Sequence, residues 1–448
     1  SLNLVLPQTM SSSFYFLLFC SYLLLIISPS TSQTTSFRPK ALVLQVTKAT
    51  STHQYFTHIT QGTPPVPVKV PIDLGGEFLW VDCEKGFNSS TKKPVPCVSA
   101  QCSLSGSEIC SANGNPSSDV CGAFPHNPFT STSTYGDLSQ DTIYIQSTDG
   151  SKPGKLVSVP KFLFTCAPTF LLEGLTSGAV GVAGLGRNNV GLPSLLSAAF
   201  GFPRKFAVCL SSSKGVVFFG DAPYVLLPGV DVSRSLTYTP LILNPKKLVS
   251  GSEAPSAEYF IGVKSIKIGG KPVPLNTSLL SFDVDGHGGT KISTVDPYTT
   301  LETSIYNAVV AAFVKELGLR NVPRVAAVAP FGACFSAKDI ALTRAGPVVP
   351  PIDFVLQSEK VVWRVSGANS MVRVSNDVSC LGFVDGGPLH FVDWGIKFTP
   401  TAIVIGGHQI EDNLLQFDLA SSRLGFGSSL LLKQTTCSNF HFTSSTAN

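Results

Sequence analysis

Short runs of β-branched and aromatic residues recur along the chain, and turn residues separate them at close spacing. The clearest runs are residues 41–46, 68–72, 78–81, 142–145, 215–219 and 259–263. Runs of this length, bounded by Gly, Pro, Asn and Ser, are typical of the strands of a β-sandwich or barrel. Hydrophobic residues make up 43% of the 448-residue chain, which is enough to form a large buried core. The sequence therefore predicts a mostly β fold.

Helical periodicity is confined to a few segments. Apolar residues recur at helical spacing from Thr303 to Leu317, and a second helix is predicted from Leu192 to Phe200. The turn at Asp412–Leu415 is a third helical candidate. Helices are thus expected to be a minor part of the fold.

Two pairs of segments indicate an internal duplication. Val70-Pro-Ile-Asp-Leu-Gly-Gly is followed by the apolar, Gly-rich segment Gly178-Ala-Val-Gly-Val-Ala-Gly-Leu-Gly. In the same way, Thr290-Lys-Ile-Ser-Thr-Val-Asp is followed by Ala402-Ile-Val-Ile-Gly-Gly. Each half thus combines a strand that ends in a turn with a later apolar strand, and we expect two lobes of related topology.

The duplication predicts where the lobes begin and end. We expect an N-terminal lobe at residues 40–225, a C-terminal lobe at 226–435 and a C-terminal tail at 436–448. Pro223 and Gly229 lie near the junction and interrupt the strand pattern.

An apolar segment near the N-terminus indicates the compartment. Residues 14–27 are apolar and are followed by a stretch rich in Ser, Thr and Pro. Fourteen residues are too few to span a bilayer comfortably but suit the core of a signal peptide, although the segment before them lacks Lys and Arg. We predict that residues 1–32 comprise a signal peptide and upstream residues, with Met10 a candidate start. An uncleaved anchor and a buried segment remain alternatives; after cleavage, no membrane association is expected.

The cysteine count agrees with secretion. Cys20 lies in the apolar leader, and ten cysteines remain, enough for five disulfides in a secreted chain. These are Cys83, Cys97, Cys102, Cys110, Cys121, Cys166, Cys209, Cys334, Cys380 and Cys437. Their spacing matches no zinc motif. The sequons at Asn88 and Asn276 are predicted glycosylation sites.

The charge of the chain argues against a nucleic-acid partner. The net charge is +4 and no run of Lys and Arg occurs, so nucleic-acid binding is not expected. Asp283-x-Asp-Gly is similar to part of a calcium loop but lacks the later acidic ligands. We therefore expect neither a metal nor a cofactor.

Several segments resemble those of pepsin-like aspartic proteases. Pro71-Ile-Asp-Leu-Gly-Gly is similar to the first active-site segment, Tyr135-Gly-Asp-Leu-Ser to the flap, and Gln416-Phe-Asp-Leu-Ala to the C-terminal strand. The resemblance covers nearly all of the chain after the leader. It implies a pepsin-like bilobal fold built from two related, barrel-like β lobes.

The catalytic pair of such a protease is incomplete in this chain. The enzyme needs two carboxylates about 3 Å apart that share one proton. Asp73 supplies the first, but Leu74 replaces the usual Thr, and Ser293 stands where the second Asp belongs. The flap keeps Tyr135 but has Leu138 where Gly is expected. We interpret the chain as a degenerate, inactive homologue.

One alternative preserves activity. Asp296 lies three residues after Ser293 and could act as a substitute carboxylate with Asp73. Pro297 follows Asp296 and favours an extended or turn backbone, so a solvated turn residue is the competing interpretation. An active aspartic-type endopeptidase therefore remains open.

The departures resemble one plant branch of this family. The branch comprises xyloglucan-specific endoglucanase inhibitors, extracellular dermal glycoproteins and basic 7S globulins. Val328-Ala-Pro-Phe-Gly-Ala-Cys-Phe and Val404-Ile-Gly-Gly-His-Gln-Ile-Glu-Asp-Asn-Leu carry this likeness. The resemblance implies an extracellular protein of the apoplast or cell wall, monomeric when free, that blocks microbial glycoside hydrolases. A storage or peptide-binding role of the 7S globulin type remains the other alternative.

The branch also implies two inhibitory loops in the C-terminal lobe. The first contains Arg320 and Arg324, although arginine at a helix C-terminus is also favoured by the helix dipole. The second falls within residues 388–401, where this chain is longer than the family loop and Pro400 stands where relatives carry Arg. His390 and Lys397 are its basic candidates, but Lys lacks the planar fork of Arg.

Overall fold

The computed structural model describes residues 37–111, 119–246, 254–389 and 400–442. The chain divides into two compact units, residues 1–38 and 39–448, and every described helix and strand lies in the second. The predicted leader, with Cys20, lies outside the described residues. Within the described ranges, no helix is long and apolar enough to cross a membrane.

Strands make up most of the regular structure, which confirms the mostly β prediction. The strands up to residue 220 are β1 (Ala41–Lys48), β2 (Tyr55–Gln61), β3 (Val66–Asp73), β4 (Leu79–Asp82), β5 (Lys93–Pro94), β6 (Cys110–Ser111), β7 (Val120–Ala123), β8 (His126–Asn127), β9 (Thr132–Ser133), β10 (Gly136–Thr148), β11 (Pro153–Ala167), β12 (Gly181–Gly184), β13 (Lys205–Cys209) and β14 (Lys214–Gly220). Each of the six predicted runs overlaps an observed strand.

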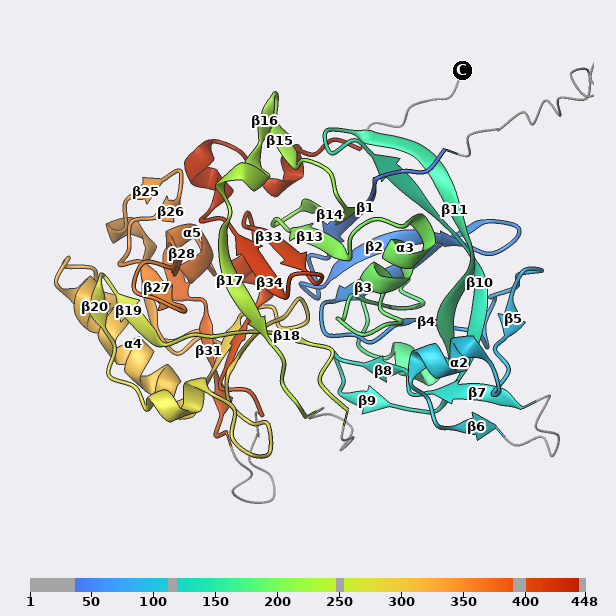
Figure 1. The fold of residues 1–448 in the computed structure, drawn as a ribbon. Helices are drawn as coiled ribbons and strands as arrows, with labels where there is room; N and C mark the ends of the chain where they lie inside the picture. Colours follow the sequence, from blue (N-terminus) through green and yellow to red (C-terminus); the bar gives the residue numbers. More distant parts are fainter. Residues whose placement is uncertain (1–36, 112–118, 247–253, 390–399, 443–448) are drawn as a thin grey trace, which may run out of the picture. The chain divides into compact units, whose positions relative to one another are not determined.

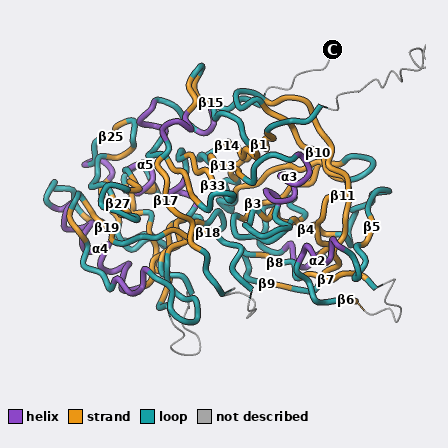
Figure 2. Tube along the Cα trace, in the orientation of Figure 1, coloured by secondary structure: helices purple, strands orange, loops and turns teal. Residues whose placement is uncertain are grey.

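The second half of the chain is built in the same way. Its strands are β15 (Val225–Leu227), β16 (Val230–Asp231), β17 (Thr237–Ile242), β18 (Tyr259–Ile261), β19 (Ser265–Ile268), β20 (Lys271–Pro272), β21 (Thr290–Ile292), β22 (Thr299–Glu302), β23 (Arg324–Val325), β24 (Cys334–Ser336), β25 (Leu342–Thr343), β26 (Gly346–Pro347), β27 (Ile352–Val355), β28 (Val362–Val365), β29 (Met371–Arg373), β30 (Val378–Leu381), β31 (Phe383–Gly387), β32 (Ile403–Ile405), β33 (Leu414–Asp418) and β34 (Arg423–Phe426). Figure 2 shows that strands and loops account for most of the trace.

Helices are few and short, with one exception. They are α2 (Ala100–Ser105), α3 (Leu192–Phe200), α4 (Thr303–Gly318), α5 (Gly367–Ser370) and α6 (Gly407–Ile410). The long helix α4 begins where the Glu302 side chain accepts hydrogen bonds from the N–H groups of Ser304 and Ile305. Its buried side chains, Ile305, Val309, Phe313 and Leu317, recur every four residues and form one face.

The sequence misplaced one helical turn and missed three short helices, α2, α5 and α6. Asp412–Leu415 is not helical, because Asp412 has a φ of 51° and β33 begins at Leu414. The missed helix α2 begins at Ser99, whose hydroxyl accepts a hydrogen bond from Cys102 N. Its six residues are too few to produce a clear helical period.

A continuous run of antiparallel strands joins the two halves of the chain. In order of pairing it is β1, β14, β13, β33, β34 and β17. Figure 1 shows the red strands β33 and β34 beside the green strand β13, although some two hundred residues separate them in sequence. The last strands of the chain therefore complete a sheet begun by the first half.

Each half contains the strand pair that the duplication predicted, and the structure shows that both pairs are parallel. β3 runs parallel to β12, with Asp73 opposite Gly184. β21 runs parallel to β32, with Ile292 opposite Ile405. The turns that follow β3 and β21 therefore occupy equivalent places in the two halves.

A buried ion pair holds the first strands against the end of the second half. Glu411 is 7% exposed. Its carboxylate lies 2.7 Å from Lys48 Nζ of β1 and 2.8 Å from Tyr55 Oη of β2, and His408 Nδ1 lies 3.5 Å from its other oxygen. One carboxylate thus satisfies a half-buried ammonium and a buried phenol.

Removing this carboxylate is expected to destabilise the protein strongly. Glu411→Ala leaves Lys48 and Tyr55 without their acceptor, and breaking a buried pair in this way costs about 3 kcal/mol or more. Urea unfolding with the disulfides intact measures the loss. Glu359→Ala, which removes a pair between Lys267 and the 71% exposed Glu359 side chain, is the control and should cost less than about 1 kcal/mol. Equal costs for the two variants would contradict the prediction.

Candidate functional site

The first turn of the candidate centre holds a buried carboxylate. Asp73 ends β3 and is 8% exposed. Its Oδ1 accepts a hydrogen bond of 2.8 Å from Gly75 N, and its carbonyl accepts one of 3.2 Å from Gly76 N. A Cβ at Gly76 would lie 2.8 Å from Gly184 Cα, so only glycine permits this close approach. The carboxylate is therefore held in one place by its own turn.

The equivalent turn holds a hydroxyl instead. Ser293 follows β21 directly, and its Oγ accepts hydrogen bonds of 3.1 Å from Val295 N and 3.2 Å from Asp296 N. Ser293 therefore closes its turn much as Asp73 closes the first. A serine hydroxyl cannot share a proton with Asp73 as a second carboxylate would.

The two turns are tied together from one side. Thr294 Oγ1 donates a 2.8 Å hydrogen bond to Ile72 O and accepts a 3.1 Å one from Leu74 N. Leu74, which is fully buried, occupies the corresponding place in the first turn and has no hydroxyl to return these bonds. Leu74 is visible in the sequence as a departure from the family pattern, whereas the role of Thr294 becomes evident only where the two turns approach each other.

An ion pair lies against the first turn, and the sequence analysis missed it. Lys291 Nζ lies 2.6 Å from Glu258 Oε1. A Cβ placed on Gly75 would lie 2.8 Å from Glu258 Cγ, so the glutamate side chain covers the glycine turn beside Asp73. The only local signal was a lysine between two residues of β21, Thr290 and Ile292, that are buried.

Burial controls the acidity of Asp73. Burial, together with the nearby charge of Glu258, raises the pKa of this carboxyl from 3.8 to about 6. The hydrogen bonds from Gly75 and Gly76 and the ammonium of Lys291 act in the opposite direction. The neighbouring carboxylate that influences Asp73 is thus Glu258, which is itself paired with Lys291.

Asp296, the candidate substitute carboxylate, belongs to the second turn. Its peptide N–H bonds to Ser293 Oγ, and its carbonyl accepts a 2.7 Å hydrogen bond from Gly407 N. Its charge raises the pKa of Lys291, after the larger effect of Glu258. Asp296 thus acts electrostatically on Lys291, and no hydrogen bond among the described residues joins its side chain to Asp73.

The shifted pKa values of three buried or half-buried carboxyl groups predict that the folded protein is most stable at acidic pH. Burial raises the pKa of Asp412, like that of Asp73, to about 6. The folded state therefore holds these protons more tightly than the unfolded chain, and this stabilisation is lost as the pH rises through about 6. Burial opposes ionisation of Glu411, but His408 and Lys48 lower its pKa to about 2, so its contribution is lost as the pH falls from about 4.5 towards 2.

Unfolding temperatures measured from pH 2 to 8 should therefore be highest near about pH 4. Asp73→Asn should flatten the decline between about pH 4 and 6, because the proton that Asp73 binds in the folded state is no longer involved. A decline that is identical in this variant would contradict the assignment to Asp73.

Tyr135, the predicted flap residue, contacts its own half of the chain. Its hydroxyl donates to Asp137 Oδ1 at 3.2 Å, and its ring meets Phe124 edge-on with centroids 6.4 Å apart. A Cβ on Gly122 would lie 2.4 Å from the ring. Among the described residues, no hydrogen bond or ring contact joins Tyr135 to Asp73 or Ser293.

The two arginines of the predicted first loop differ in their surroundings. Both are exposed. Arg324 starts β23 and donates from Nη2 to Gly332 O at 2.9 Å, across the hairpin that β23 forms with β24. Arg320 follows α4, and no ion pair or side-chain hydrogen bond joins it to another described residue. Leu319 beside it is 68% exposed.

The first loop lies beside the strand that leads to the second. A cavity of about 520 Å³ is lined by Ala329, Pro330 and Phe331 of the hairpin and by Val384 and Asp385 of β31. β31 ends at Gly387, just before residues 388–401. The second-loop candidates His390 and Lys397 lie outside the described residues.

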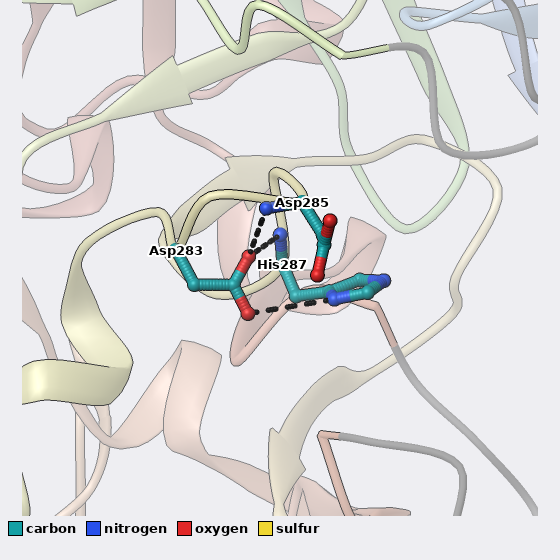
Figure 3. Close-up of side chains that lie close together, drawn as sticks. All are labelled: Asp283, Asp285 and His287. Carbon is teal, nitrogen blue, oxygen red and sulfur yellow. Dashed lines mark hydrogen bonds and ion pairs between the residues drawn. The ribbon is translucent and has the colours of Figure 1, made fainter.

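The Asp-x-Asp segment forms a closed turn. Figure 3 shows Asp283, Asp285 and His287 with their ligand atoms close together. Asp283 Oδ1 accepts hydrogen bonds of 2.9 Å from both Asp285 N and His287 N, and its Oδ2 lies 3.5 Å from His287 Nδ1. The hydrogen bonds within this exposed turn account for the cluster without a metal ion.

Five disulfides use all ten cysteines expected to be paired. They are Cys83–Cys166, Cys97–Cys110, Cys102–Cys121, Cys209–Cys437 and Cys334–Cys380. The sequon residues Asn88 and Asn276 are both exposed. Glycosylation at these two positions stays a prediction.

The chain is similar in sequence to known plant proteins and matches two family models. Residues 55–221 match the family model described as "Xylanase inhibitor N-terminal", and residues 258–428 match "Xylanase inhibitor C-terminal". The chain is 58% identical to the "Probable aspartic proteinase GIP2" of Nicotiana benthamiana, over 96% of this chain and 98% of that protein. It is 44% identical to "Gamma conglutin 1" of Prunus dulcis, over 97% and 98%.

Solved structures agree with these matches. The crystal structure of EDGP is 55% identical with a TM-score of 0.87, and the match covers 91% of this chain and 100% of that one. The basic 7S globulin of soybean is 34% identical with a TM-score of 0.74 and the same coverage. The predicted pepsin-like fold and its plant branch are thereby confirmed.

Proposed function

The chain belongs to the xylanase inhibitor family, and from this premise we propose that it is a secreted, proteolytically inactive protein that inhibits a microbial cell-wall glycoside hydrolase. The target that we propose is a xyloglucan-specific endo-β-glucanase. The observation that carries the proposal is Ser293, which leaves Asp73 without a second carboxylate in the equivalent turn. A pepsin-type centre with one carboxylate cannot act as acid and base together.

The first loop supplies a chemical basis for inhibition. Glycoside hydrolases use a pair of carboxylates in an open cleft. A guanidinium can engage such a carboxylate through two parallel, charge-assisted hydrogen bonds. Arg320 is exposed next to the apolar Leu319, so insertion into the cleft would bury apolar surface and form an ion pair. Arg324, bonded to Gly332 O, is proposed to position the hairpin.

The second loop is proposed to contribute from the same surface. β31 leads into residues 388–401 and lines the cavity beside the first loop. His390 and Lys397 are its basic candidates, and neither carries the planar fork of arginine. We therefore assign the larger contribution to Arg320.

We also propose that the protein acts outside the cell. Cleavage of the leader would release a protein with five disulfides into the extracellular space of the cell wall. Glycans at Asn88 and Asn276 would lie on exposed surface. The free protein is proposed to be a monomer.

Two assays on the purified mature protein, from about residue 33, test the proposal. The first titrates it into a fungal family 12 endoglucanase that hydrolyses xyloglucan, and the second follows cleavage of a denatured protein at acid pH with and without pepstatin. We expect stoichiometric loss of glucanase activity and no proteolysis. Pepstatin-sensitive cleavage would overturn the proposal in favour of an endopeptidase using Asp73 with Asp296. Inactivity in both assays would favour another target or a globulin-like storage role.

A further inference from the structure

A second cavity in the second half of the chain is lined by neither Asp73 nor Ser293. Its volume is about 410 Å³, within the range of about 300–1,000 Å³ that is usual for small-molecule sites. It is bounded by the end of β17, the segment after β18 and residues 280–282. Most of its lining is apolar, with Ile242, Val263, Leu280 and Phe282 prominent.

One charged group at this cavity lacks an intramolecular counterpart. Lys264 lines the cavity and is exposed, and no carboxylate of the described ranges forms an ion pair with it. A carboxylate on a ligand could therefore form a charge-assisted hydrogen bond with its ammonium.

The acidic residue next to the cavity lining in sequence accepts hydrogen bonds within its own turn. Asp283 follows the lining residue Phe282, but its carboxylate closes its own turn through Asp285 N and His287 N (Figure 3). Lys264 therefore provides the uncompensated charge at the cavity, and this charge is positive.

We propose that this cavity binds a small organic monoanion with an apolar body. The apolar lining receives the body, because an apolar cavity of this size gains free energy by excluding water. Lys264 pairs with the carboxylate or sulfonate of the ligand. The shared chemistry fits an aromatic acid or a medium-chain fatty acid.

Gly262 allows a steric test at the centre of the lining. A Cβ on Gly262 would meet one atom, Ile242 Cδ1, at 3.2 Å. That atom is the end of a flexible side chain, so a larger residue enters the cavity without straining the backbone. The leucine side chain of Gly262→Leu is therefore expected to occupy the cavity, while the backbone after β18 keeps its position.

Isothermal titration of the full mature protein with 2-naphthoate and with decanoate tests the proposal, with neutral 2-naphthamide as the uncharged probe. We expect the protein to bind at least one acid, and Lys264→Glu to weaken binding at least about tenfold. Gly262→Leu should abolish binding. Lys85→Glu, which makes the same charge change on an exposed loop of the first half, should leave the affinity unchanged.

The ligand class and the site are tested separately. Decanoate bound without naphthoate identifies an aliphatic ligand, and the reverse identifies an aromatic one. Binding of neither acid, equal affinity for 2-naphthamide, or unchanged affinity in both the Lys264 and Gly262 variants would overturn the proposal. The unfolding temperature of each variant shows that it is folded. Because glucanase inhibition is not the readout, failure here is distinct from failure of the proposed function.

Discussion

Replacing Arg320 by alanine is expected to weaken inhibition of the xyloglucan-specific endo-β-glucanase by about 30-fold or more, which corresponds to a hot-spot loss of about 2 kcal/mol. Arg320 is exposed and makes no side-chain bond to another described residue, so its guanidinium is available to a partner. In the target cleft it would lose its water and pair with a catalytic carboxylate. The measurement is the inhibition constant from xyloglucan hydrolysis at several inhibitor concentrations.

Three variants distinguish this role from a general charge effect. Arg320→Lys keeps the charge but loses the planar fork, and should recover only part of the affinity. Arg324→Ala removes the bond to Gly332 O and should weaken inhibition less, through a looser hairpin. Arg344→Ala, at an exposed turn between β25 and β26, should have no effect. An Arg320→Ala variant as potent as the parent would refute the role given to this loop.

Restoring the second carboxylate alone is not expected to restore proteolysis. Ser293→Asp supplies the missing carboxyl, but the Glu258–Lys291 pair still covers the glycine turn beside Asp73. The ammonium of Lys291 also lowers the pKa of Asp73, which opposes the shared proton that the mechanism needs. Cleavage of a denatured protein at acid pH should therefore stay at background in this variant.

Removing the ion pair together with the serine should produce activity. Replacing both partners of a buried pair by apolar residues is often close to neutral for stability, so Glu258→Ala with Lys291→Leu should fold. Combined with Ser293→Asp, these changes are expected to raise pepstatin-sensitive cleavage at least about a hundredfold above background, a typical gain from one general acid or base. Adding Asp73→Asn to this triple variant is the control and should abolish the gain. Efficient cleavage by Ser293→Asp alone would show that the ion pair is no obstacle.

Local pattern predicted the elements well because it acts within a few residues. Runs of β-branched and aromatic residues between turn residues identified the strands, and helix α3 has the predicted bounds, ended by Gly201 with a φ of 71°. The false helical turn at Asp412–Leu415 has the same origin, because a short segment does not reveal that Asp412 adopts a positive φ. Short elements are therefore where sequence reasoning failed.

The candidate site was predicted in part. Asp73 and Ser293 do occupy equivalent turns, as the duplicated segments indicated. Glu258 lies 33 residues before Lys291, and no local pattern connects them. The hydrogen bonds of Thr294 to Ile72 and Leu74 join residues at least 220 positions apart in the chain. Local sequence pattern could therefore not predict them.

The sequence was sufficient to predict the mostly β class, the duplicated halves and the serine in place of the second carboxylate. Each of these depends only on residue type and on spacing along the chain. The tertiary structure alone decided which cysteines pair, that an ion pair covers the first turn, and that one threonine ties the two turns together. The same holds for the cavity beside Lys264, which is assembled from segments between residues 239 and 357. The physical reason is that contacts between distant segments depend on the path of the folded chain, which local alternation and propensity do not encode.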